Sequence, residues 1–176
     1  PIVEEIELPK APIRFIFPHA PMQPVTINGG YVMRAWYDIR TTEIVRQEDA
    51  DGVRASQVQI ELLMANERAR GTPQSRIVLA GFSQGGAIAL QTGLRQAEPV
   101  AGIMALSTYL PIAESLAAEI TPAGQATPIF FAHGTADPVV PLTRASASRD
   151  ALAAQGCKVA WHEYPMPHSV CGPELV

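Results

Sequence analysis

A serine between two glycines, in the run Gly81-Phe82-Ser83-Gln84-Gly85, has a spacing in which a serine hydroxyl can act as a nucleophile. The apolar run over residues 76–82 predicts a strand buried on both faces of a parallel sheet, and the small residues over 84–96 predict a helix directly after it. A sharp strand-to-helix turn strains the serine backbone and projects its hydroxyl above the sheet edge. This context favours a catalytic serine over one that only caps a glycine-rich helix start.

The residues around this serine suit such a turn. Gly81 and Gly85 carry no side chains, so the strand and the helix can approach each other closely, and Gly86 and Ala87 extend this contact. The backbone N–H of Gln84 lies at the predicted helix N-terminus, where it can donate to a negatively charged oxygen. We therefore expect Gln84 to supply one donor of an oxyanion hole.

A serine hydroxyl is a weak nucleophile at neutral pH and needs a base that is itself oriented by a carboxylate. In one large class of hydrolases these groups occur in the order Ser, Asp, His, each in a loop after a strand. Asp137 follows the predicted strand 128–132, and His168 follows the predicted strand 158–164. Because the carboxyl ends of parallel strands meet at one sheet edge, we predict Ser83, Asp137 and His168 as a catalytic triad.

Other histidines and aspartates fit this scheme less well. His19 lies upstream of the serine, which is the wrong order for the base, and His133 is expected to brace the loop of the triad acid. His162 lies inside the last predicted strand and is expected to be a packed or a surface histidine. Asp150 is expected to stay solvated on a helix face, and Asp38 to make structural hydrogen bonds. An exposed loop histidine is the alternative for His168.

Short apolar runs alternate along the chain with longer helical patterns, which is typical of βαβ units and a parallel sheet. We predict strands over residues 13–17, 76–82, 100–106, 128–132 and 158–164. Helices are predicted over 52–70, 84–96, 112–120 and 142–155, and residues 19–50 form a long loop of the kind that is often functional. The pattern predicts one α/β domain over residues 1–176, with a mostly parallel sheet and helices on both faces.

Composition restricts the classes of function. With 47% hydrophobic and 17% charged residues among 176, the chain has the composition of one globular domain. A net charge of −4 leaves no basic stripe for a phosphate backbone, so we expect no nucleic-acid partner. No apolar run is long enough for stable membrane insertion, and the acidic residues 1–7 lack signal-peptide features, which predicts a cytoplasmic protein. Cys157 and Cys171 have the spacing of neither metal ligands nor a disulfide framework.

An ester-binding pocket needs an apolar wall beside a few polar groups. The candidates for this wall are aromatic or aliphatic residues in the long loop, beyond the end of the predicted strand 100–106, and beside the predicted triad acid: Trp36 and Tyr37, Leu110, and Val139 and Val140. Plain core packing is the alternative for each of them. The absence of charged side chains among these positions favours neutral or lipophilic acyl groups.

Three motifs occur in order along the chain: the serine motif at 81–86, His133-Gly134-x-x-Asp137-x-Val139-Val140, and Tyr164-Pro165-Met166-x-His168. Together they resemble the carboxylesterase and acyl-protein thioesterase family of α/β-hydrolases. Residues 26–30, 36–39 and 105–111 are similar to stretches of the bacterial carboxylesterases in that family, and the likeness runs from about residue 1 to residue 170.

The resemblance implies an α/β-hydrolase fold and a serine esterase that acts on small-molecule esters with short to medium acyl chains. Acyl-protein thioesterase or lysophospholipase activity is the alternative within the same class, and a non-catalytic binding module of the same fold is the alternative of another class. The resemblance also implies the same triad, no metal or other cofactor, and a homodimer.

The chain departs from the family pattern at both ends. Family members normally carry two strands before the position of Pro1, with a His-Gly-x-Gly loop that supplies a second oxyanion donor, whereas this chain starts within what resembles the following helix. It ends at residues 174–176, where the family continues into a closing helix, and Pro167 replaces the usual glycine before the histidine. We therefore expect a partial member without one oxyanion donor, a group worth about 2.7–4 kcal/mol.

Overall fold

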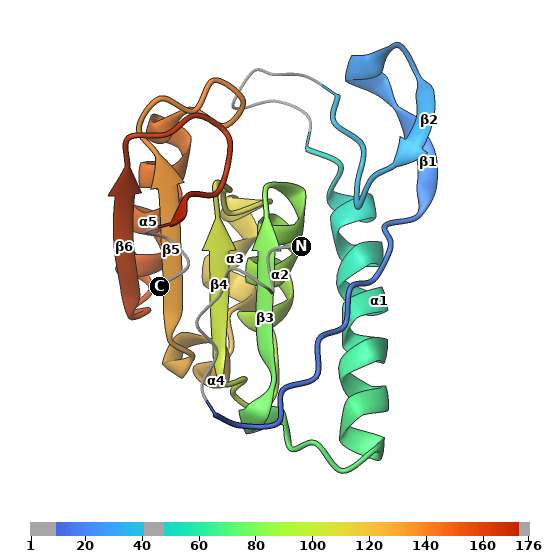
Figure 1. Cartoon of the computed structure of the whole chain (residues 1–176), viewed down its shortest axis with the longest axis vertical. Helices are drawn as coiled ribbons and strands as arrows, with labels where there is room; N and C mark the ends of the chain where they lie inside the picture. The colour runs from blue at the N-terminus through green and yellow to red at the C-terminus, as the bar shows by residue number, and fades with distance from the viewer. Residues whose placement is uncertain (1–9, 41–47, 173–176) are drawn as a thin grey trace.

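The computed structural model describes residues 10–40 and 48–172. Its centre is a four-stranded parallel sheet in the order β3-β4-β5-β6, so each strand lies beside the next strand in the chain. In Figure 1 the four arrows point toward one end of the molecule, where the turn after β3 and the loops after β5 and β6 lie. The strands are β3 (Val78–Phe82), β4 (Gly102–Leu106), β5 (Ile129–Gly134) and β6 (Val159–Tyr164).

Helices precede the first of these strands and occupy the connections between them. α2 (Gln84–Gly93) packs against β3 and β4, α5 (Leu142–Ala154) packs against β5 and β6, and α1 (Ala50–Ala69) lies against α2. Figure 1 shows α2 and α5 behind the sheet. Shorter turns complete the connections: η3 (Gln74–Arg76), η4 (Ala113–Ser115), α3 (Leu116–Glu119) and α4 (Pro122–Ala126). This architecture confirms the predicted α/β class.

Two apolar clusters stabilise the arrangement. The larger one is centred on β4 and β5, where Ile103, Ile129 and Phe131 are at most 2% exposed and pack against α2 and α5 side chains. Full burial of such a side chain stabilises a fold by about 1.5–3 kcal/mol. The smaller cluster joins the segment before α1 to α1 and α2 and consists of Tyr37, Val53, Ala87, Ile88 and Ile112. It lies next to the first turn of α2 and so supports the region of Ser83.

One face of β3 is open among the described residues. The side chains of Val78 and Phe82 are 57% and 37% exposed, whereas Leu79 between them is 8% exposed and faces the core. Because side chains alternate between the faces of a strand, the helices cover only the Leu79 side. The prediction that this strand is buried on both faces is therefore wrong for the described part of the chain.

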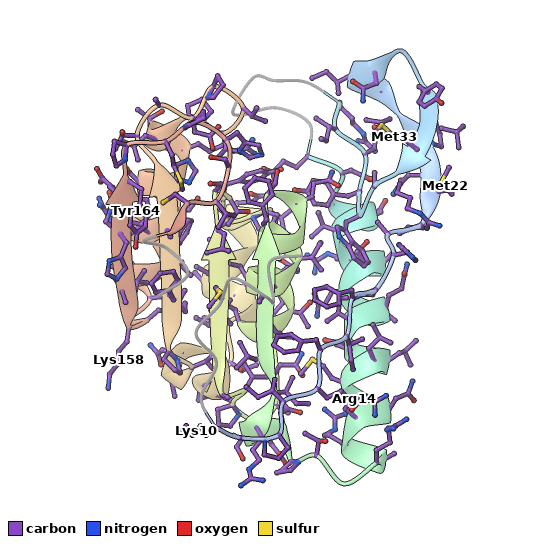
Figure 2. All side chains as sticks on the ribbon, viewed as in Figure 1. Lys10, Arg14, Met22, Met33, Lys158 and Tyr164 are labelled. Carbon is purple, nitrogen blue, oxygen red and sulfur yellow. The ribbon has the colours of Figure 1, made fainter. Side chains whose placement is uncertain are left out.

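The predicted strand over residues 13–17 is not formed. This segment is exposed and runs outside the sheet along α1, where Arg14 Nε lies 3.7 Å from Glu67 Oε2 (Figure 2). Phe17 is 67% exposed. Its apolar pattern is that of a strand, but a strand also needs a neighbour for its backbone groups, and none of the described strands pairs with it.

The long segment over 19–50 contains a hairpin where the sequence predicts a loop. β1 (Met22–Val25) pairs antiparallel with β2 (Tyr31–Arg34), joined by η2 (Thr26–Asn28) and by Gly29 and Gly30, which both have positive φ. Figure 2 shows Met22 and Met33 on this hairpin, away from the main sheet. The Asn-Gly-Gly run was the available turn signal, since glycine adopts positive φ without strain.

Element boundaries differ modestly from the predictions. α2 ends at Gly93 rather than at residue 96, α4 was not predicted, and residues 112–120 divide into η4 and α3. The expectations about the helix-like start and about the chain end at 174–176 lie outside the described residues, as does part of the 19–50 segment. Among the described helices, none combines the length and apolar character needed to cross a bilayer. The cytoplasmic location stays a prediction.

Candidate active site

The turn between β3 and α2 holds Ser83 at φ 54° and ψ −122°, a positive φ that residues other than glycine rarely adopt. A Cβ atom on Gly81 would lie 2.1 Å from the backbone carbon of Gly85, so only glycine allows the strand and helix to approach this closely. The same holds for Gly86, where a Cβ atom would lie 2.7 Å from the Gly81 carbonyl oxygen. Both observations confirm the steric reasoning from the sequence.

Gly85 differs from this expectation, because its position has room for a side chain. A Cβ atom there would meet no described atom within 4 Å, because it is the backbone of Gly85, and not its missing side chain, that faces Gly81. The two glycines of the motif therefore have unequal roles: the first is sterically required, and the second supplies backbone to the contact.

The three predicted triad residues form one hydrogen-bonded line. His168 Nε2 lies 3.0 Å from Ser83 Oγ, and His168 Nδ1 lies 2.7 Å from Asp137 Oδ2. Since a carboxylate only accepts hydrogen bonds, Nδ1 carries the proton and Nε2 presents a lone pair to the serine hydroxyl. This is the tautomer that can accept the proton of Ser83.

Asp137 is fixed in the loop after β5 by backbone donors. Its Oδ1 accepts hydrogen bonds from the N–H groups of Val139 and Val140, at 2.8 and 2.9 Å, and its side chain is fully buried. Burial raises the pKa of this carboxyl, but the hydrogen bonds from His168, Val140 and Val139 outweigh burial and lower the pKa below its ordinary value. The carboxylate is therefore charged and immobile at neutral pH.

His133 braces the same loop, as expected from the sequence. Its Nε2 lies 2.8 Å from the carbonyl oxygen of Val140, so the ring donates from this nitrogen. The same nitrogen is 3.6 Å from Asp137 Oδ2. Burial lowers the pKa of His133, which keeps the ring neutral and leaves the Asp137 charge to His168.

Two contacts at the site are not predicted by the sequence. The Phe82 ring packs against the His168 ring, with centroids 4.6 Å apart. The side-chain amide of Gln84 accepts a hydrogen bond from the Trp36 N–H at 3.1 Å and donates to the Tyr37 carbonyl at 2.9 Å. The residue predicted as an oxyanion donor through its backbone thus also holds the predicted acyl-binding segment against α2.

The predicted pocket residues divide into two groups. Tyr37 is buried in the smaller cluster, with its hydroxyl 2.7 Å from that of Tyr109, and Leu110 belongs to the larger cluster. Val140 is 4% exposed and Val139 64% exposed, while Trp36 is half-buried beside Gln84. Core packing, the alternative left open by the sequence, fits Tyr37, Leu110 and Val140. Trp36 and Val139 keep exposed apolar surface near the triad.

The remaining polar candidates have structural or surface roles. Asp38 accepts hydrogen bonds from the Thr26 N–H at 2.7 Å and from its hydroxyl at 2.6 Å. Asp150 lies on the solvent side of α5, and the exposed His162 of β6 stacks its ring on those of Phe130 in β5 and Tyr164 in β6. His19 is exposed and lies in the segment before the hairpin.

A parallel sheet in sequential order, a serine at positive φ between strand and helix, and a histidine and an aspartate in loops at the same sheet edge define an α/β-hydrolase. The chain belongs to the phospholipase/carboxylesterase family, whose model matches residues 2–176. It is therefore an ester hydrolase.

Relatives and solved structures support this assignment. The chain is 39% identical over 171 residues to acyl-protein thioesterase 1 of Gibberella zeae, covering 93% of this chain and 73% of the relative. It is 43% identical over 172 residues to acyl-protein thioesterase 1 of Neurospora crassa, covering 93% and 70%. The crystal structure of Arabidopsis thaliana SOBER1 superposes with a TM-score of 0.86 at 31% identity, covering 91% of this chain and 78% of that one. The crystal structure of Zea mays acyl-protein thioesterase 2 superposes with a TM-score of 0.80 at 27% identity, covering 89% of this chain and 74% of that one.

Proposed function

We propose that this chain hydrolyses thioesters between acyl chains and protein cysteines, through an acyl-enzyme on Ser83. The observation that carries the proposal is the line Ser83–His168–Asp137, with distances of 3.0 and 2.7 Å and a lone pair of His168 facing the serine. The thioester preference rests on the relatives at 39–43% identity, which are named acyl-protein thioesterases. Hydrolysis of small carboxylic esters is the second candidate, favoured by the family description and by the bacterial carboxylesterase resemblance.

The first half of the reaction forms the acyl-enzyme. His168 Nε2 accepts the proton of Ser83 as Oγ attacks the thioester carbonyl carbon. The N–H of Gln84, the first residue of α2 and without a partner inside the helix, donates to the resulting oxyanion. When the C–S bond breaks, His168 returns its proton to the cysteine thiolate, which leaves as a thiol.

The second half releases the acid. His168 removes a proton from water, whose oxygen attacks the acyl carbon, and the C–O bond to Ser83 breaks as the imidazolium returns the proton to Oγ. Asp137 stays ionised and orients the imidazole through Nδ1 in both halves. Neither half requires a redox or metal step.

Matched substrates separate the two candidate specificities. We would compare hydrolysis of one peptide octanoylated on cysteine with the same peptide octanoylated on serine, because only the scissile heteroatom differs. The proposal expects a higher kcat/KM for the cysteine peptide after correction for the intrinsic reactivity of thioesters. An equal or lower corrected value would reject thioesterase specificity and favour the carboxylesterase.

A fluorophosphonate probe tests the nucleophile independently. It should label Ser83, and Ser83→Ala should abolish both labelling and hydrolysis of the two peptides. Labelling of another residue, or undiminished hydrolysis by Ser83→Ala, would overturn the mechanism whatever the substrate preference.

A further inference from the structure

The two residues that follow β4 lie between the catalytic elements. β4 is a central strand, with β3 and its Ser83 turn on one side and β5 on the other. Immediately after it come Ser107 and Thr108, which are both completely buried although both carry hydroxyl groups. Buried hydroxyls need hydrogen-bond partners, and the partners here are backbone carbonyls of the serine turn and of the histidine loop.

Thr108 holds the carbonyl side of the nucleophile. Its hydroxyl donates to the Ser83 carbonyl oxygen at 2.6 Å, while the Ser83 N–H donates to the Leu106 carbonyl at 2.9 Å. Leu106 and Thr108, two positions apart in the chain, thus bind the N–H and the carbonyl of Ser83. The Thr108 methyl group lies 2.7 Å from the place where a Cβ of Gly86 would be, so the side chain packs directly on the first turn of α2.

Ser107 holds the loop of the base. Its Oγ donates to the Ser169 carbonyl at 3.2 Å, directly after His168, and its N–H donates to the Ala132 carbonyl of β5 at 2.9 Å. Its φ is 46°, an unfavourable backbone angle for serine. This strained residue therefore links β5 to the histidine loop through its backbone and its side chain.

We propose that Ser107 and Thr108 are positioning residues that set the distance between Ser83 Oγ and His168 Nε2. Thr108 fixes the strained turn that projects the nucleophile, and Ser107 fixes the loop that presents the base. Neither contacts a reacting atom. The proposal rests on the proposed function, in which these two atoms exchange a proton, since proton transfer depends steeply on their separation and alignment.

Thr108→Val tests the first contact, because valine keeps the shape and removes only the donor. We expect kcat for a p-nitrophenyl ester and the rate of fluorophosphonate labelling to fall about tenfold, with KM changed less than about twofold. Thr108→Ser, which keeps the hydroxyl, should recover most of both rates. Ser107→Ala should likewise lower kcat and leave KM unchanged, because it frees the histidine loop and not the substrate surface.

Thr127→Val is the matched control. Thr127 is also completely buried, and its hydroxyl donates to the Ala123 carbonyl at 2.9 Å, away from the triad. It should lower the unfolding temperature as Thr108→Val does while keeping kcat. Unchanged kcat and labelling in Thr108→Val and Ser107→Ala, or equal losses in Thr127→Val, would overturn the positioning role.

Ser83→Ala separates this outcome from failure of the proposed function. If Ser83→Ala is inactive and unlabelled while Thr108→Val and Ser107→Ala behave as wild type, the nucleophile stands and the positioning role is wrong. If Ser83→Ala retains activity, the proposed function itself is wrong, whatever the result for Thr108→Val and Ser107→Ala.

Discussion

Replacement of Asp137 by asparagine tests the orientation of the catalytic base. In the structure one carboxylate oxygen accepts from two backbone N–H groups and the other accepts from His168 Nδ1. The asparagine oxygen would keep the two backbone bonds, so its NH₂ group would face Nδ1. Two donors cannot share a hydrogen bond, and the imidazole would then carry its proton on Nε2 instead.

The expected loss follows from that change of tautomer. A proton on Nε2 points at Ser83 Oγ across the 3.0 Å contact, so the ring donates where it must accept. General-base catalysis is then lost, and the corresponding change in a serine protease triad lowers kcat about 10⁴-fold. A factor of this size equals about 5.4 kcal/mol of transition-state stabilisation.

The assay is steady-state hydrolysis of a p-nitrophenyl ester, with protein folding followed by circular dichroism. Glu119→Gln is the matched carboxylate-to-amide control, because Glu119 pairs with Arg54 and Arg95 and contacts no triad residue. We expect its kcat to stay within about twofold of wild type. A folded Asp137→Asn variant that keeps more than a tenth of wild-type kcat would refute the proposed role of Asp137.

Three further predictions concern stability. Gly81→Ala should destabilise the fold by about 3 kcal/mol and abolish fluorophosphonate labelling, whereas Gly85→Ala should unfold near the wild-type temperature, since its Cβ meets no described atom. Hydrogen bonds from Arg54, Arg95 and Ser115 lower the pKa of Glu119 from 4.5 to about 2, so the stability that Glu119 contributes is complete above pH 4.5 and lost as pH falls toward 2. The difference in unfolding temperature between wild type and Glu119→Gln should shrink over that range. His133→Leu should lower the free energy of unfolding, measured in urea, by about 1–3 kcal/mol and should also lower kcat. His133→Gln, which keeps a hydrogen-bond donor, should recover part of the stability and part of kcat.

The hydrogen-bonded arrangement of Ser83, His168 and Asp137 was predictable because it depends on local signals and on one topological rule. The glycines around Ser83 predict a tight strand-to-helix turn, and the parallel strands place Asp137 and His168 at the same edge of the sheet. His133 could be assigned a bracing role because it lies at the end of β5, directly before the loop that carries Asp137. These inferences require only the order of elements and no knowledge of how side chains pack.

Contacts between distant segments were not predictable in the same way. The bonds from Thr108 to Ser83 and from Gln84 to the Trp36 segment join residues 25 and 48 positions apart, and no spacing in the sequence marks them. Residues 13–17 show the converse problem, because a local apolar pattern predicts a strand while pairing depends on a neighbour. Leu110 follows β4 and Val140 lies three residues after Asp137, yet both side chains are buried and belong to core packing.

The positive φ of Ser83 puts catalysis and folding stability in competition at a single position. Such a backbone angle costs a residue with a side chain about 1–3 kcal/mol, while glycine adopts it freely and loses about 0.5–1 kcal/mol through its greater freedom in the unfolded chain. Ser83→Gly is therefore expected to melt at a higher temperature than wild type and to be inactive. In a library screened only for expression or heat resistance, this inactive variant would be enriched, so selection of stabilised forms of this enzyme must include turnover as a criterion.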